Sequence, residues 1–299
     1  MRFNFINLKR VTLIIILISI LGLVGCFHNI KREDIKPFIW NVSKNNKDNI
    51  LIGSIHGSDK YHNFFSSEVE DIIKDMDTLA VELDITLEEN LNKIKQATYL
   101  NEGDSIENYL SNEEIKKLEL ILNKNTNIDD SMLKNLTPFG VNSLLSSMYN
   151  INLTEPGLDL LLIEYAKKNS IEINEIEDID VKIDNYKKIY TWDYIKNEIN
   201  SFSEEKFKSK IDQETEVWNQ YINSDIEGLE KSLIEFKNTS EAEYKSTIID
   251  RNITMAKKLD NLFIDSKKHV VVLGVLHFIG SDGILELLKK DGYTIERIS

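Results

Sequence analysis

The sequence predicts an α/β fold in which two βαβ units form one central sheet and a large helical insertion separates the units along the chain. Two observations carry this prediction. A short, apolar and β-branched run ends in Gly-x-x-His near the start of the chain, and a second run of the same kind ends in the same motif near its end. Between the two runs, most of the sequence has the periodicity of helices.

The clearer of the two units lies near the end of the chain. Residues 270–274 carry no polar side chain, which predicts a short strand buried on both faces. The motif Gly274-x-x-His277 ends this strand, and the glycines after it predict a tight loop before a helix over about 283–290. A strand at 293–298 completes the unit. The carboxyl end of a buried strand is where open α/β sheets bind their ligands.

The other unit begins with a predicted β-hairpin over about 38–55, which ends in Gly53-x-x-His56. An amphipathic helix over about 64–76 follows, and a strand comes after it. Glu82 interrupts the apolar run of that strand near its end. An ionised carboxylate is costly in such a place unless it is paired or bound to a metal.

The predicted helical insertion covers residues from about 87 to 263. One short strand, 171–176, is expected within it. Thr86 and Glu89 have the spacing of a capping box, which predicts that the first helix begins with Thr86 as its N-cap. The many acidic residues of these helices are expected to form solvated faces.

The first segment, residues 1–25, has the pattern of a lipoprotein signal peptide. Three basic residues precede an uncharged apolar run that is too short for a comfortable membrane span of about 20 residues. The run ends in Leu-Val-Gly-Cys26, which resembles a bacterial lipobox, in which the cysteine is acylated, for example with palmitate. We therefore expect a lipid anchor on Cys26 at the extracytoplasmic face of the cell membrane and a tether over 26–37. The alternative is an uncleaved anchor helix.

Composition excludes several other classes of function. Cys26 is the only cysteine, so the chain has neither a disulfide framework nor a cluster of thiolate metal ligands. Removing the signal peptide leaves 33 of the 36 Lys and Arg against all 50 Asp and Glu, a formal charge of −17. This balance argues against nucleic acid as a partner, because phosphate binding requires a basic surface.

Two histidines and one carboxylate at the ends of neighbouring strands form a predicted catalytic and metal site, made of His56, Glu82 and His277. A metal held there would lower the pKa of its bound water towards about 7 and polarise a substrate carbonyl. Glu82 is either a ligand or the general base. The structural alternatives are histidines in turns and a salt-bridged glutamate. Arg251 is either a solvated residue or a group that binds a substrate carboxylate.

Several motifs together resemble the TraB/GumN family, which includes the pheromone-shutdown proteins and is similar to the Tiki metalloproteases. The resemblance spans residues 38–299. It rests on Gly53-Ser54-Ile55-His56, Val81-Glu82-Leu83-Asp84, Gly157-x-Asp159 with Glu177 downstream, Arg251-Asn252, and Gly274-Val275-Leu276-His277-x-x-Gly280 with Gly292-Tyr293.

This resemblance implies an erythromycin-esterase-like α/β fold and a metal-dependent peptide hydrolase, with Mn or Co as the metal and Zn as the alternative. Its site residues would be His56, Glu82 and His277, with Arg251 as a weaker match. Ser54 stands where the family more often has threonine, and Phe278-Ile279 stands where leucine and proline are common; neither departure removes a ligand.

The sequence therefore predicts a lipid-anchored hydrolase that cleaves peptides or proteins at the cell surface. Two alternatives remain open at this stage: a surface protein that binds or sequesters a peptide signal without cutting it, and a purely structural lipoprotein. Neither the substrate nor the oligomeric state is predicted.

Overall fold

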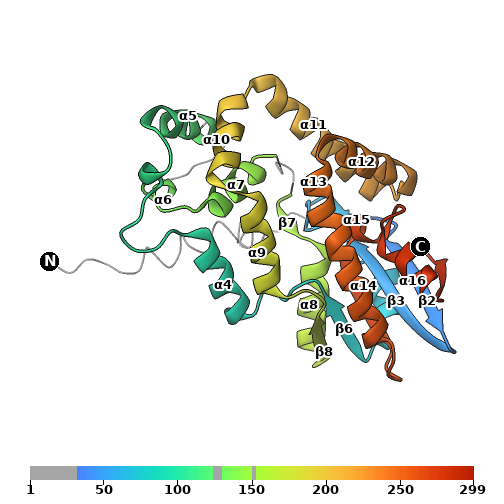
Figure 1. The fold of residues 1–299 in the computed structure, drawn as a ribbon. Helices are drawn as coiled ribbons and strands as arrows, with labels where there is room; N and C mark the ends of the chain where they lie inside the picture. The colour runs from blue at the N-terminus through green and yellow to red at the C-terminus, as the bar shows by residue number, and fades with distance from the viewer. Residues whose placement is uncertain (1–31, 124–129, 150–152) are drawn as a thin grey trace. The chain divides into compact units, whose positions relative to one another are not determined.

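The computed structural model describes residues 32–123, 130–149 and 153–299 (Figure 1). The predicted signal peptide and Cys26 lie outside these residues. No helix among the described residues is both long and apolar enough to cross a membrane. The chain forms two compact units: the first comprises the described parts of Met1–Glu82, Asn152–Ile176 and Val217–Ser299, and the second those of Leu83–Ile151 and Glu177–Glu216.

The first unit contains a six-stranded mixed sheet with the strand order β10-β2-β3-β9-β6-β8. Four neighbouring strands, β3, β9, β6 and β8, run parallel, whereas β2 is antiparallel to both of its neighbours. The strands of this sheet are β2 (Phe38–Lys44), β3 (Lys47–Ser54), β6 (Thr78–Val81), β8 (Glu172–Glu175), β9 (His269–Gly274) and β10 (Thr294–Arg297). The protein is therefore a mixed α/β protein, as the sequence predicts at this level.

The two strands that carry the Gly-x-x-His motifs are neighbours in this sheet. β3 and β9 pair in parallel, with Ser54 opposite Gly274. β6 lies on the other side of β9, also in parallel. As a result, His56, Glu82 and His277 all follow the carboxyl ends of adjacent parallel strands, which confirms the predicted adjacency of the two units.

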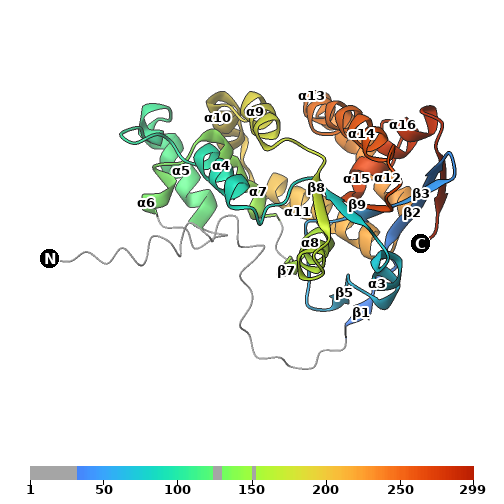
Figure 2. The same cartoon turned by 90° about the horizontal axis from the view of Figure 1, so that it is seen from below.

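Helices cover both faces of this sheet (Figure 2). α3 (Ser67–Ile73) and α8 (Leu158–Lys168) lie on one face, and α14 (Asp250–Leu262) and α16 (Ile284–Lys290) lie on the other. Apolar residues of all four helices belong to the same core as the sheet. The remaining helices of this unit are α12 (Ile226–Thr239), α13 (Glu241–Tyr244), the π-helical turn Lys245–Ile249 and α15 (Val275–Phe278).

The second unit is helical in its described residues. It contains α4 (Glu88–Thr98), the 3₁₀ turn Ile106–Asn108, α5 (Asn112–Asn123), α6 (Asp130–Leu133), α7 (Pro138–Ser147), α9 (Ile179–Ile189) and α10 (Trp192–Ser201). A small core of its own includes Leu83, Ala97, Ile179 and Ile183. α11 (Glu204–Ile222) begins in this unit and ends in the first.

The predicted insertion 87–263 is thus divided between the two units. The expected strand at 171–176 is present as β8, and it extends the edge of the central sheet. The segments 153–176 and 217–263 therefore pack with the sheet, and the other described residues of the insertion form the helical unit. A helical pattern in the sequence predicts the helices but carries no information about which core they join.

The capping-box prediction is wrong. α4 begins at Glu88, and its N-cap is Leu87, whose side chain makes no capping hydrogen bond. The hydroxyl of Thr86 instead donates to the carboxylate of Asp84 at 2.5 Å. The short turn between Asp84 and Thr86 therefore satisfies the threonine locally, one residue before the position that a capping residue occupies.

Part of the predicted tether 26–37 is folded against the domain. Its last residues include β1 (Glu33–Asp34), which pairs in parallel with β5 (His62–Asn63). Ile35 is buried in the main core. Two further short strands, β4 (Gly57–Ser58) and β7 (Glu155–Pro156), pair with each other in antiparallel fashion.

The β2–β3 hairpin turns at two asparagines. Asn45 and Asn46 have φ angles of 55° and 61°, the left-handed conformation that two-residue type I′ hairpin turns require at both central positions. Asparagine tolerates this region better than other residues with a Cβ. The turn fixes the register in which β3 enters the sheet and so the position of the residues at its end.

We predict that Asn46→Ala lowers the free energy of unfolding by about 1 kcal/mol, because alanine tolerates the left-handed backbone conformation less well than asparagine does. Asn46→Gly, which pays no such cost, serves as the matched control and should leave the stability unchanged or raise it. Urea unfolding followed by circular dichroism measures both. Equal loss in the two variants would contradict this account of the turn.

Candidate functional site

Glu82 is buried at the carboxyl end of β6, with 8% of its surface exposed. Arg251 Nη2 donates to its Oε2 at 2.8 Å, and the backbone N–H of Gly274 donates to its Oε1 at 2.9 Å. Charge-assisted hydrogen bonds of this kind offset the cost of burying an ionised carboxylate. The sequence predicts that this carboxylate is paired or metal-bound, and the structure pairs it with Arg251.

His277 lies next to this carboxylate, in the single turn α15 that follows β9. Its side chain is buried, and its Nδ1 lies 2.7 Å from Oδ1 of Asn252. Because an amide oxygen only accepts, Nδ1 carries the proton and the basic lone pair of the neutral ring is at Nε2. This Nε2 lies 3.9 Å from Oε1 of Glu82, which is too long for a direct hydrogen bond.

Two adjacent residues of α14 hold this pair in place. Arg251 binds Glu82, and its Nη1 also donates to the carbonyl of Thr247 at 3.2 Å. Asn252, whose Oδ1 faces His277, donates from Nδ2 to the carbonyl of Asp282 at 2.8 Å. The orientation of the amide is therefore fixed from both ends. The π-helical turn Lys245–Ile249 directly precedes α14, and such turns are frequent at functional sites.

His56 lies in a different environment. Its side chain is 69% exposed, and its Nδ1 lies 3.1 Å from Oδ2 of Asp159 in the first turn of α8. The N-cap of α8 is Gly157, where a Cβ would lie 2.3 Å from the carbonyl oxygen of Ile55. The close approach of α8 to the end of β3, which brings Asp159 to His56, therefore requires a glycine.

Asp159 also lies close enough to Tyr221 to act on it electrostatically. The hydroxyl of Tyr221 is buried and donates to the carbonyl of Gly53 at 2.9 Å. Burial, and to a smaller extent the charge of Asp159, raises the pKa of this hydroxyl, so Tyr221 remains a neutral donor. It anchors the strand residue that begins the first Gly-x-x-His motif.

The described residues bring together two of the three predicted metal ligands. Among residues 32–123, 130–149 and 153–299, no group of three His, Cys, Asp or Glu side chains is arranged to hold a metal ion. Glu82 and His277 suit two of the ligand positions around one metal ion. A histidine that binds a metal through one nitrogen usually donates from the other to an oxygen, as Nδ1 does here to Asn252. The predicted set of three, with His56, is not assembled.

Sequence reasoning missed the residues that orient the ligands. Asn252 and Asp159 belong to motifs quoted above, but no local pattern pairs Asn252 with His277 or Asp159 with His56. The backbone N–H of Gly274 was missed as well, although the position of this glycine in the strand beside Glu82 is a usable signal. Arg251, predicted as a substrate-binding residue, is the partner of Glu82.

These observations define a class of protein: a mixed α/β protein with a buried glutamate and a buried histidine at the carboxyl ends of adjacent parallel strands, and with a partly buried helix arginine paired with the glutamate. The family model of the TraB/PrgY/gumN family matches residues 38–297. The chain therefore belongs to the TraB/PrgY/gumN family, which confirms the resemblance described above. A search of curated proteins finds no match.

We predict that Arg251→Met lowers the free energy of unfolding by about 3 kcal/mol, because it leaves the buried carboxylate of Glu82 without its cation. The double variant Glu82→Gln/Arg251→Met should recover part of this loss, since no charge is then left uncompensated. Urea unfolding measures both, and Lys257→Met, at an exposed position of the same helix, is the control. A loss no larger than that of the control would show that the pair contributes no stability.

We also predict that Asp159→Asn changes the tautomer of His56. A carboxylate accepts from Nδ1–H, whereas an amide can offer a donor or an acceptor, so the variant should lose the preference for a proton on Nδ1. Long-range ¹H–¹⁵N spectra of the histidines report this directly. An unchanged His56 spectrum would mean that Asp159 does not orient this ring.

Proposed function

We propose that this protein is a hydrolase of peptides and that Glu82 and His277 are its reaction centre. The observation that carries the proposal is the pair itself: a buried carboxylate and a buried imidazole whose Oε1 and Nε2 lie 3.9 Å apart at the carboxyl ends of β6 and β9. General acid and base catalysis uses these groups most often. Family membership supports the proposal.

In this proposal His277 acts as the general base. With its Nδ1 proton directed at Asn252, the ring presents Nε2 to a water molecule and takes its proton as that water attacks the carbonyl carbon of the substrate. The imidazolium that forms is stabilised by the carboxylate of Glu82 and by the amide oxygen of Asn252. The same proton is then available to the leaving amine.

Arg251 and the Gly274 N–H have a positioning role in this scheme. Both hold Glu82 in its ionised form and in one orientation. The negative charge beside Nε2 is therefore present before the reaction starts, so that no rearrangement is needed when the histidine becomes charged. Removing Arg251 would therefore disturb both the charge and the position of the Glu82 carboxylate.

The proposal has a second form with a divalent metal, Mn²⁺ or Co²⁺ with Zn²⁺ as the alternative. Nε2 of His277 and Oε1 of Glu82 are the atoms that would hold it, and His56 is the third ligand that the sequence predicts. In this form the Nε2 lone pair would bind the metal, so His277 would be a ligand and not the general base. A metal bound there would supply Lewis-acid polarisation of a water or a carbonyl. We also propose the erythromycin-esterase-like assignment of the fold and a lipid anchor on Cys26 at the extracytoplasmic face of the membrane.

One observation favours a second function, the binding or sequestration of a peptide without cleavage. Both oxygens of Glu82 already accept hydrogen bonds, from Arg251 and from the Gly274 N–H. A binding protein would use the same cluster to recognise the polar groups of a peptide. Such a protein would return the peptide intact.

We predict that the full-length protein, purified in detergent without a histidine tag, cleaves members of a synthetic peptide library. His277→Ala should lower kcat/KM by about 100-fold or more, which is the usual contribution of a general base. His62→Ala is the matched control, because His62, which lies on β5, pairs with Asp59 and has no part in the proposed chemistry. Mass spectrometry of the digests measures all three.

Metal dependence is tested in the same assay. Elemental analysis of the purified protein is followed by chelation and then by addition of Mn²⁺, Co²⁺ or Zn²⁺. Loss and recovery of cleavage would support the form with a metal, and cleavage unchanged by chelation would support His277 as the general base. Cleavage that His277→Ala leaves unchanged would rule this reaction centre out. Binding of peptides that are always recovered intact would support the second function.

A further inference from the structure

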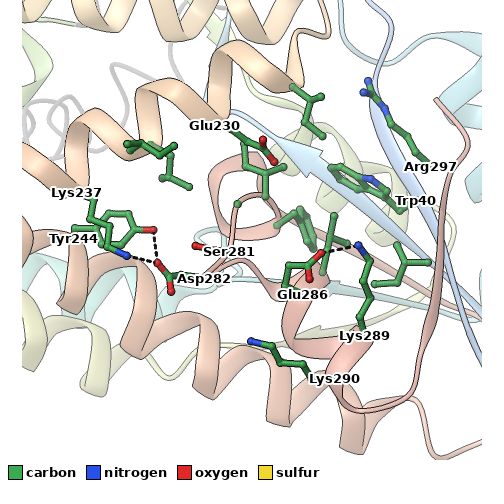
Figure 3. Close-up of a pocket in the computed structure, with 18 residues that line it drawn as sticks. Trp40, Glu230, Lys237, Tyr244, Ser281, Asp282, Glu286, Lys289, Lys290 and Arg297 are labelled. Atoms are coloured by element: carbon green, nitrogen blue, oxygen red, sulfur yellow. Dashed lines mark hydrogen bonds and ion pairs between the residues drawn. The ribbon is translucent and has the colours of Figure 1, made fainter.

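The first unit contains a pocket of about 850 Å³ outside the Glu82–His277 cluster (Figure 3). It lies between α12, α13, α16 and the strands β2 and β10, and the loop after α15 lines it. This volume is within the range of about 300–1,000 Å³ that is common for small-molecule sites. The functional site described above does not use it.

One wall of the pocket is apolar. An apolar ligand could therefore bury a body of several carbon atoms against this wall. Ile234 contributes to it with 58% of its surface exposed, so its apolar surface is largely in contact with water when the pocket is empty. The apolar lining residues with accessible surface are Ile226, Ile234 and Ile295, and the almost fully buried Trp40, Leu233, Phe278 and Leu285 complete the lining.

The other end of the pocket carries an excess of positive charge around Asp282. Lys237 donates to its carboxylate at 2.8 Å and Tyr244 at 3.1 Å. The Lys237 hydrogen bond, with a smaller contribution from the charge of Lys290, lowers the pKa of Asp282, so its carboxyl group is ionised. Two ammonium groups therefore face one carboxylate, in a chain whose net charge is −14.

Lys290 has no partner of its own at this end. It makes no ion pair and no hydrogen bond with any residue in the described part of the chain. The other cations of the pocket are occupied: Lys289 pairs with Glu286 at 2.6 Å, and Arg297 donates to the carbonyl of Ser299. Figure 3 shows Lys290 reaching out from α16 below Asp282.

Glu230 sets the direction in which a ligand would bind. It lines a part of the pocket that is separate from Lys237 and Lys290, and within the described residues it forms no ion pair (Figure 3). A carboxylate would be repelled there and attracted to the lysine end. The hydroxyl of Ser281, which makes no hydrogen bond to the residues described, lies in the pocket as a further donor.

We propose that this pocket binds an amphipathic carboxylate, with its apolar body against Ile226, Ile234 and Ile295 and its carboxylate between Lys237 and Lys290. Two sources share this chemistry, a medium-chain fatty acid and the C-terminus of a short apolar peptide. The inference does not depend on the proposed hydrolase, because it concerns binding alone.

The pocket is connected to the Glu82–His277 cluster through the chain. Phe278, which lines the pocket, directly follows His277, and Asp282 receives through its carbonyl the amide hydrogen bond of Asn252. The loop between these residues thus contributes to both places. A ligand in the pocket would therefore lie beside the loop that carries the proposed general base.

The experiment is isothermal titration calorimetry of the full-length protein with four probes. They are decanoate, decan-1-ol, N-acetyl-trileucine with a free C-terminus, and its C-terminal amide, each below its aggregation concentration. We expect saturable binding of at least one carboxylate and at least fivefold weaker binding of its uncharged counterpart. The tighter of the two carboxylates identifies the source, and mass spectrometry after the titration checks that the peptide is intact.

Two variants place the ligand in the pocket. Lys290→Met should weaken binding by about fivefold, as expected for a partly exposed ion pair, and Ile234→Glu should weaken it by about tenfold or more through repulsion of the carboxylate and loss of apolar contact. Both positions are exposed, so both variants should fold. Lys257→Met, outside the pocket, is the control and should bind as the wild type does.

Three results would overturn the proposal. They are the absence of saturable binding by either carboxylate, equal binding of the acids and their uncharged counterparts, and binding that neither Lys290→Met nor Ile234→Glu alters. None of them bears on peptide cleavage, so failure of this proposal and failure of the proposed hydrolase are distinguishable.

Discussion

The ion pair between Glu82 and Arg251 is the interaction on which the rest of the site depends. Burying a carboxylate at the end of a strand costs free energy, because the charge loses its contact with water. The guanidinium of Arg251 and the backbone N–H of Gly274 offset this cost. These contacts join the end of β6 to α14 and β9, whose contacting residues are 169 and 192 positions further along the chain. Because Asn252 follows Arg251 on the same helix, the element that neutralises the glutamate also orients His277.

This constraint links the fold to the chemistry. The parallel pairing of β6 with β9 places Glu82 beside Gly274, and the turn of α15 returns His277 over the same carboxylate. The two side chains are held with Nε2 and Oε1 3.9 Å apart, without a direct hydrogen bond between them. The cluster is thus preorganised, which is the property that proton transfer and metal binding both require and that a structural salt bridge alone does not exploit.

The sequence predicts the strands that carry the site residues, but it does not predict the side chains that contact His56 and His277. The hairpin, the adjacency of the two motif strands and the position of Glu82 follow from local patterns, because strands and their ends leave a signal within a few residues. The environment of His56 does not. β4 pairs with β7, which draws the chain after His56 towards the start of α8 and Asp159, and two-residue strands leave no detectable pattern. The partner of His277 was missed because the packing of helix α14 brings Asn252 to it, and this packing leaves no local pattern in the sequence.

The central claim is that Glu82 and His277 act as one catalytic unit, and a double-mutant cycle in kcat/KM tests it most directly. The cycle compares Glu82→Gln, His277→Ala and the double variant on one peptide that the wild type cleaves. If the two residues act as a unit, the double variant loses about as much activity as the more damaging single variant, because the first substitution already removes the function of both. Losses that multiply in the double variant would contradict the account, since each residue would then contribute independently.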